Sequence, residues 1–317
     1  MIYRNYRYIA FALTLLTTFS LAYARPKTVQ NTVIDDLGNT HFTIQKKAPR
    51  IASVSIFGAE LTLALGFHPV AMSTYPGGIP DYLPELKYTD QLGPRSQTNF
   101  EALYRSKPDI VIGLRRMVEP HSKRYEEISP TVGFDLITLG DSFEAVQKSS
   151  DLIGQHEQGK QINKCFVNSL QTMKEKIGNK SLSGVFLTSA GITPRAYYSH
   201  YMTVGLMNEL NIKNVAGASP YSSKMPFSGQ VGLEWLVKLN PDIIFMYEGS
   251  EAQYTKTNVW DSLSAVKNNR VYKVGGHWRE PEGPYSRIWV SMDIAHKAYP
   301  DLFSAPTLHK LNRALLC

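Results

Sequence analysis

The chain has 317 residues, of which 43% are hydrophobic, and its 34 basic and 27 acidic side chains give a formal net charge of +7. This length is enough for two domains of ordinary size, and the modest positive surplus favours an anionic ligand. No basic run is interleaved with aromatic residues, and no apolar stretch after the first 24 residues approaches membrane-spanning length. The composition therefore argues against a nucleic-acid-binding protein and against a membrane-spanning one.

The chain opens with a segment typical of a secretory signal peptide. Arg4 and Arg7 form a basic start, residues 9–21 form an apolar core, and Ala22-Tyr23-Ala24 has the small residues of a cleavage site. We therefore predict that residues 1–24 are a signal peptide. Because no cysteine directly follows the predicted cleavage site after Ala24, we expect a soluble periplasmic protein without a lipid anchor.

The first half of the remaining chain predicts short strands that alternate with helices. Residues 32–44 predict a hairpin, and residues 50–55 predict a buried strand that leads into a helix over 58–65. Further strands are expected at 70–74, 110–114 and 136–139, and a helix is expected over 143–153. Such alternation is the pattern of an open α/β sheet.

Residues 158–177 predict a long amphipathic helix of roughly 30 Å, because apolar side chains recur there close to every 3.6 residues. Beyond it the α/β alternation resumes. Strands are expected at 185–189 and 270–274, and helices at 202–210 and 285–299.

Two segments of the chain repeat one pattern without a gap, at residues 99–112 and 232–245. Glu101 aligns with Glu234, and a Pro-Asp-Ile triplet follows at the same spacing in both. Each copy predicts a short helix ended by a proline and then a buried strand. One unit used twice predicts two similar lobes, with a ligand site between them.

We therefore expect an α/β fold of two similar lobes with mainly parallel sheets, joined by a single long helix, with a ligand cleft between the lobes. The N-terminal lobe would cover residues 25–142, the connector 143–180 and the C-terminal lobe 181–317. Cys165 and Cys317 can form one disulfide, which would tie the last residue to the connector; the sequence leaves open whether they are bonded.

The chain resembles the substrate-binding proteins of bacterial ABC importers for iron complexes and cobalamin. The resemblance spans roughly residues 30–305. It is carried by the segments 36–39 (DLGN), 48–51 (APRI), 58–66 (GAELTLALG), 91–101 (QLGPRSQTNFE) and 107–109 (KPD), and by the second repeat. It implies a monomer that binds a small iron chelate and delivers it to a permease dimer in the inner membrane. It implies neither an enzyme nor a cofactor.

The resemblance also gives a role to the two repeated glutamates. In cobalamin and siderophore binders the glutamate of this helix meets arginines of the permease, one glutamate for each permease subunit, so Glu101 and Glu234 are the expected permease-docking residues. Paired carboxylates on two similar lobes suit a two-fold partner. For Glu101 a second reading is a capping box with Thr98.

Residues at the expected carboxyl ends of the strands suit an anionic, partly flat ligand, because ligands of open α/β sheets gather there. Guanidinium groups bind carboxylate or catecholate oxygens and stack on aromatic faces. The predicted ligand contacts are Tyr75, Arg115, Arg116, Arg195, Tyr198, Trp278 and Arg279. Trp278 could equally belong to the core, and the adjacent Arg115 and Arg116 need not both point inward.

The sequence also offers alternative functions. A heme binder of the same class would carry a tyrosine where this chain has Gly93-Pro94-Arg95, and a cobalamin binder stays an alternative. The scattered histidines predict no metal site, although His200 or Tyr201 could complete an iron shell. Gly140-Asp141-Ser142 with Asp293 and His296 imitates a serine esterase, but Asp141 or Ser142 is better explained as a helix N-cap. The sequence therefore favours capture of a ferric siderophore or similar chelate.

Overall fold

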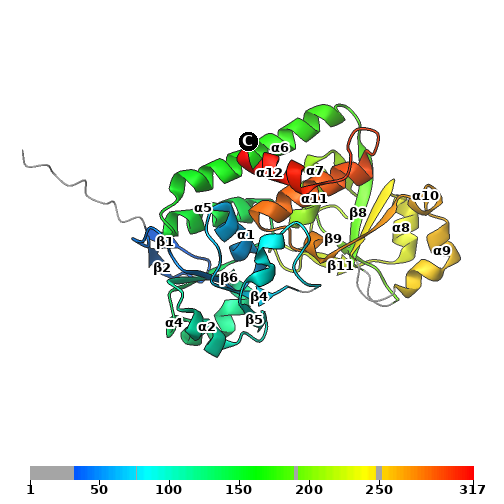
Figure 1. Ribbon diagram of the computed structural model, residues 1–317. Helices are drawn as coiled ribbons and strands as arrows, with labels where there is room; N and C mark the ends of the chain where they lie inside the picture. The colour runs from blue at the N-terminus through cyan, green and yellow to red at the C-terminus, as the bar shows by residue number, and fades with distance from the viewer. Residues whose placement is uncertain (1–31, 76, 189–191, 248–251) are drawn as a thin grey trace, which may run out of the picture. The chain divides into compact units, whose positions relative to one another are not determined.

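The computed structural model describes residues 32–75, 77–188, 192–247 and 252–317. The predicted signal peptide lies outside these residues. Within them, the strands form a two-stranded hairpin and two separate sheets of five and six strands (Figure 1). The hairpin joins β1 (Thr32–Ile34) to β2 (Thr40–Phe42), as the alternation of residues 32–44 predicts. The α/β fold with two mainly parallel sheets is confirmed.

The first sheet has the strand order β5-β4-β3-β6-β7, and every neighbouring pair is parallel. Its strands are β3 (Ile51–Ser53), β4 (Ala71–Thr74), β5 (Gln91–Pro94), β6 (Ile110–Leu114) and β7 (Thr131–Phe134). Because a parallel sheet must be covered on both faces, β3, β6 and β7 are buried along their length, whereas the edge strand β5 is partly exposed.

Alternate side chains of this sheet pack against helices on opposite faces. Ile51 and Ile112 face α1 (Ile56–Ala64) and α5 (Leu139–Leu152). On the other face, Val111 packs with residues of α2, α3 and α4. These three are α2 (Phe100–Ser106), α3 (Arg115–Val118) and α4 (Ser122–Glu126), and the first half also has the 3-10 helices η1 (Pro84–Tyr88) and η2 (Glu119–His121).

The second sheet has the order β11-β9-β8-β12-β13, with β10 paired to β8. The pairs that join β8 to β9 and β9 to β11 are antiparallel, and the others are parallel. The strands are β8 (Leu182–Thr188), β9 (Arg195–Tyr197), β10 (Ile212–Asn214), β11 (Ser228–Gln230), β12 (Ile243–Tyr247) and β13 (Val271–Val274).

Helices cover both faces of the second sheet as well. Phe186 and Phe245 lie in a cluster with α6, α7 and α11, and Val185 and Ile244 in a cluster with α8, α9 and α10. The bounds are α7 (Met202–Glu209), α8 (Leu233–Leu239), α9 (Asn258–Asp261), α10 (Ser264–Lys267), α11 (Pro284–Ala298), η3 (Gln253–Lys256) and η4 (Gly276–Trp278).

The predicted strand at residues 136–139 is wrong. The strand of this region is β7, five residues earlier, and α5 already begins at Leu139. Thr138 is its N-cap: the Thr138 side chain accepts a hydrogen bond from the Asp141 backbone, and the Asp141 carboxylate accepts one from Thr138. This capping box makes residues 136–138 the approach to a helix, so the predicted caps at Asp141 and Ser142 are also wrong.

The two repeated units have the same backbone. Helices α2 and α8 both end at a residue in the left-handed conformation, Lys107 with φ 45° and Asn240 with φ 41°. A proline follows each one, because the residue before a proline avoids the helical region, and the strand β6 or β12 begins two residues after that proline. The predicted Thr98 capping box is absent: Asn99 caps α2 by accepting from the Ala102 backbone at 2.9 Å.

The long helix is confirmed as α6 (His156–Ile177), with its apolar stripe buried. It packs against α5, α11 and the last helix, α12 (Leu308–Leu316), which the sequence did not reveal (Figure 1). A disulfide joins Cys165 of α6 to Cys317, with their Cα atoms 5.3 Å apart. No described helix has both the length and the apolar character that a membrane span needs.

Reduction of this disulfide should destabilise the protein, because it closes a loop with a sequence separation of 152 residues. Such bonds contribute about 2–4 kcal/mol to the free energy of unfolding. We expect the midpoint of urea unfolding, followed by circular dichroism, to fall when a reductant is added. The Cys317→Ser variant is the control and should unfold at one lower midpoint with or without reductant. Equal midpoints for the oxidised and reduced wild type would contradict the prediction.

Candidate functional site

Glu60 of α1 holds the start of α11, a helix of the second half of the chain. Its Oε2 accepts hydrogen bonds from the Tyr285 backbone at 3.0 Å, from the Ser286 backbone at 2.8 Å and from the Ser286 hydroxyl at 3.0 Å. A Cβ atom on Gly283 would lie 2.2 Å from the same oxygen, so only glycine allows this approach. The carboxylate thus caps the helix N-terminus from outside the helix.

Arg287, one turn into α11, ties the second half of the chain to α5 and α6. Its guanidinium donates to Ser142 Oγ at 3.2 Å and to Asn163 Oδ1 at 2.8 Å, and it lies over the Phe166 ring at 4.5 Å. Burial lowers the pKa of Arg287 to about 9. The contacts of this fully buried cation are therefore neutral oxygens and the faces of two aromatic rings, Phe143 and Phe166.

The esterase reading fails on this geometry. Ser142 is fully buried and donates its hydroxyl proton to the Glu282 carbonyl at 2.6 Å. His296 contacts the Phe303 carbonyl at 2.8 Å, while Asp293 accepts from Lys297 and from the Trp278 indole. The three side chains are each occupied by other partners, so they form no nucleophile, base and orienting acid.

Glu280 is bonded to two arginines of the first half. Arg95 forms a bidentate pair with it, with Nη2 2.8 Å from Oε1 and Nη1 bonded to Oε2, and Arg116 Nη2 lies 2.8 Å from Oε1. Arg95 follows β5, Arg116 follows β6, and Glu280 follows β13, so the carboxyl ends of both sheets meet here. This is the edge at which open α/β sheets bind ligands.

The charges at this junction do not balance. Burial alone would raise the pKa of Glu280, but its hydrogen bond with Arg95 and the charges of Arg95, Arg116 and Arg279 hold that pKa below its ordinary value. Burial, together with the charge of Glu280, raises the pKa of Glu282 well above its ordinary value. The lowered pKa favours ionised Glu280 and the raised pKa favours protonated Glu282, so among the described residues the positive charges of Arg95, Arg116 and Arg279 exceed the negative charge beside Glu280.

Tyr75, Arg116 and Arg279 are brought together at this junction. Tyr75 is buried, and its pKa is raised by burial and by the charges of Glu280 and Glu282. The guanidinium of Arg279 lies over the Tyr247 ring at 5.2 Å. The sequence analysis did not identify Arg95 or Glu280 as site residues, although Arg95 directly follows β5 and Glu280 lies in the segment after β13.

Four other predicted contacts lie elsewhere. Arg195 pairs in register with Thr188, which places it at the carboxyl end of β8, and it donates to the Ser228 carbonyl at 3.2 Å. Tyr198 lies beyond the far end of β9, with its ring 6.4 Å from that of His200. Among the described residues, neither forms a hydrogen bond or ion pair with Arg95, Arg116 or Glu280, so their part in a ligand site stays a prediction.

Arg115 and Trp278 need correction. Arg115 diverges from Arg116 and pairs with Glu119 at 3.2 Å and Asp135 at 3.3 Å, beside a polar cavity of about 300 Å³. Its charge is therefore already balanced. Trp278 is fully buried against Phe186 and Phe245 and presents no surface to a ligand, so it belongs to the core.

The residues considered for direct iron contact have other partners. Tyr201 is buried and donates its hydroxyl proton to the Arg279 carbonyl, while a His200 ring nitrogen contacts the Lys224 carbonyl at 3.0 Å. In the part of the chain that the structure describes, no three His, Cys, Asp or Glu residues gather as metal ligands would.

Comparison with known proteins identifies relatives over most of this chain. The family model described as "Periplasmic binding protein" matches residues 51–276. The uncharacterized ABC transporter substrate-binding lipoprotein YvrC of Bacillus subtilis is 28% identical, over 85% of this chain and 86% of its own. The probable siderophore-binding lipoprotein YfiY of the same organism is 26% identical, over 74% of this chain and 77% of its own.

Among solved structures, Staphylococcus aureus SirA complexed with staphyloferrin B matches with a TM-score of 0.70 and 18% identity. The match covers 84% of this chain and 98% of that one. This likeness supports a fold of two lobes, like that of the matched binding protein.

The expectation of a periplasmic protein without a lipid anchor is corrected by these relatives. Both YvrC and YfiY are named lipoproteins. Similar chains therefore include lipoproteins, and the prediction of a protein without a lipid anchor does not stand.

Glu60→Gln should change how stability depends on pH. Burial raises the pKa of Glu60 from 4.5 to about 7, while hydrogen bonds from Ser286 and Tyr285 limit the rise. The folded state then binds more protons than the unfolded state between these values, so stability falls as the pH rises from 4.5 to 7. We expect the wild type to lose about 3 kcal/mol relative to Glu60→Gln over that range, at about 1.4 kcal/mol for each pH unit. Urea unfolding at a series of pH values measures this, and parallel curves for the two proteins would contradict it.

Proposed function

The chain belongs to the periplasmic binding protein family, and we propose that it captures a ferric siderophore or related iron chelate between its two lobes. Proteins of this family are the substrate-binding components of ABC transporters and are not enzymes. The chelate would be transported cargo rather than a cofactor. The names of YfiY and of the staphyloferrin B complex of SirA support this class of ligand.

The surplus of positive charge at the junction of the two halves is the observation that carries the proposal. Among the described residues, Arg95 and Arg116 both bond to the carboxylate of Glu280, and the charge of Arg279 also acts on it. The side chain of Arg116 is 40% exposed, so its guanidinium can still be reached by a ligand. Ferric siderophores enclose iron in oxygen donors and often keep a net negative charge, and forked guanidinium donors suit such oxygens.

We also propose that the chain is divided into two lobes and a helical connector. The strands of the first sheet lie between residues 51 and 134, and those of the second between residues 182 and 274. Helices α5 and α6 fill the interval between them. This order supports lobes over residues 25–142 and 181–317 with a connector over 143–180.

Fluorescence titration with a panel of metal complexes tests the proposal. Trp278 directly precedes Arg279, so a bound ferric complex should quench tryptophan emission. We expect saturable quenching by one of three ferric chelates, a tricatecholate, a trihydroxamate or citrate. Saturable binding of only hemin or only cobalamin would transfer the proposal to that alternative, and no binding by any of them would refute it.

Two adjacent arginines give this titration a matched control. Arg116→Ala should weaken chelate binding about 10- to 100-fold, because a charge-assisted hydrogen bond contributes about 1.5–3 kcal/mol. Arg115→Ala removes the same charge one residue away, where Glu119 and Asp135 already balance it, and should change affinity less than about twofold. Unchanged affinity in Arg116→Ala would remove Arg116 from the site, and an equally large loss in Arg115→Ala would show that the effect is not specific to Arg116.

We propose in addition that Glu101 and Glu234 dock the protein onto a permease dimer. Both are exposed, and they occupy equivalent positions in the first turn of α2 and α8. Among the described residues, Glu101 forms an ion pair only with Arg105 on its own helix, at 2.7 Å, and Asn99 supplies the cap, so capping does not explain this glutamate. Glu234 borders a shallow apolar hollow with Val237 and Val259.

The double variant Glu101→Ala/Glu234→Ala should bind the chelate with unchanged affinity and fail in transport. Removing both carboxylates takes away the charges that orient the protein on a two-fold partner. Uptake of the radiolabelled ferric chelate by cells that carry the cognate permease should fall at least about tenfold. The matched control is Glu157→Ala/Glu175→Ala, which removes two exposed carboxylates from α6. Normal uptake by the first variant would refute docking through these residues.

A further inference from the structure

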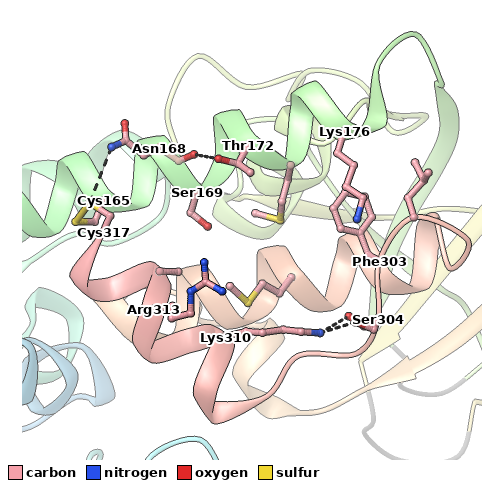
Figure 2. A pocket seen from close by; sticks show the side chains of 14 residues that line it. Cys165, Asn168, Ser169, Thr172, Lys176, Phe303, Ser304, Lys310, Arg313 and Cys317 are labelled. Carbon is pink, nitrogen blue, oxygen red and sulfur yellow. Dashed lines mark hydrogen bonds between the residues drawn. A yellow bond between two sulfur atoms is a disulfide. The ribbon is translucent and has the colours of Figure 1, made fainter.

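A cavity of about 460 Å³ lies between α6, α12 and the segment that joins α11 to α12 (Figure 2). Its volume is within the range of small-molecule sites, about 300–1,000 Å³. It shares no lining residue with the cluster around Glu280. The fold thus contains a second concave site, separate from the proposed chelate site.

The floor of this cavity is apolar. Met173 of α6 and Met292 of α11 contribute thioether side chains, and Leu302 and Phe303 come from the segment after α11. Met173 is buried, whereas the other three are partly exposed. Methionine side chains adapt to the shape of an apolar ligand, so the floor suits a flexible hydrocarbon chain better than a rigid polar group.

The ionisable residues that line the cavity are all basic. They are Lys176, Lys310 and Arg313, and no Asp or Glu lines it. Lys310 Nζ is held by Ser304 Oγ at 2.6 Å and the Ala305 carbonyl at 2.7 Å, while Lys176 Nζ lies 5.0 Å from the centre of the Phe303 ring. Neither lysine has a carboxylate partner among the described residues, so no acidic side chain neutralises the positive charge at the rim.

Arg313 is the free donor of this group. In Figure 2 its guanidinium points into the space between α12 and α6, below Ser169. No carboxylate of the described part of the chain forms an ion pair with it. The Cys317 backbone donates to the Arg313 carbonyl at 3.1 Å, and Cys317 is bonded to Cys165 of α6. The disulfide therefore holds Arg313 one helical turn from a fixed point on the opposite wall.

We propose that this cavity binds a carboxylate with a medium-length hydrocarbon chain. The carboxylate would accept the forked donors of Arg313, with Lys176 adding charge at the rim, and the chain would lie on Met173, Met292 and Leu302. An anionic head and an apolar tail match both halves of the lining, whereas a small inorganic anion would leave the floor unused.

Calorimetric titration of the full-length protein with three probes tests this inference. Decanoate has both head and tail, decyltrimethylammonium has the same tail with the opposite charge, and acetate has only the head. We expect saturable one-to-one binding of decanoate below its micellar concentration and none of the other two. Equal binding of the cationic probe would mean that the apolar floor alone selects, and absence of decanoate binding would equally overturn the proposal.

Variants on the two walls place the binding in this cavity. Arg313→Gln should weaken decanoate binding about tenfold, the loss of one charge-assisted hydrogen bond, and Arg313→Lys should recover part of it. Ser169→Trp should abolish binding by filling the space between α6 and the Arg313 guanidinium. Lys164→Gln is the matched control, because Lys164 is an exposed cation of α6 outside the cavity.

All four variants should quench normally with the ferric chelate, so failure here is distinguishable from failure of the proposed function. Unchanged decanoate affinity in Arg313→Gln and Ser169→Trp would refute the site. Circular dichroism checks the fold of Ser169→Trp, and Arg313→Gln, on an exposed side chain, keeps the test decisive if that variant does not fold.

Discussion

The cost of burying charge governs how the two halves of this chain meet. Glu60, Glu280 and Arg287 are all buried, and each finds its hydrogen-bond partners on an element from the other half of the chain or on the helices between the halves. A buried charge without such partners costs several kcal/mol. Because these groups find their hydrogen-bond partners in this arrangement of the halves, they favour it over the others that apolar packing alone would allow.

The same contacts explain why the junction can hold an anion. Arg95 and Arg116 share the carboxylate of Glu280, and the raised pKa of Glu282 favours its protonated form, so the described groups that fix the halves favour a positive surplus at the carboxyl ends of both sheets. Arg287 joins α11 to α5 and α6 through buried hydrogen bonds. A stiff helical connector held in this way favours small rearrangements over wide opening on ligand capture.

Local patterns in the sequence predict much of this fold. Strand β6 matches its expected bounds, and α1, α6, α7 and α11 begin within about two residues of theirs. The short strands β5, β9 and β11 were missed, because three or four residues with little alternation give no periodic signal. The pair of Arg95 with Glu280 joins residues 185 positions apart, and the divergence of Arg115 from Arg116 depends on which carboxylates the fold places nearby. Neither follows from spacing along the chain.

Helix α6 contributes to both the junction and the cavity, and its two faces keep them independent. Asn163 accepts from Arg287 on one side, while Cys165 and Met173 line the cavity on another. A ligand in the cavity could affect the junction only if α6 had two positions of similar free energy. The hydrogen bonds of Arg287 to α5 and α6 are buried, and the disulfide ties α6 to α12 beside the cavity, so a shift of α6 would leave a buried cation without partners. We therefore expect the two proposed sites to act independently of each other.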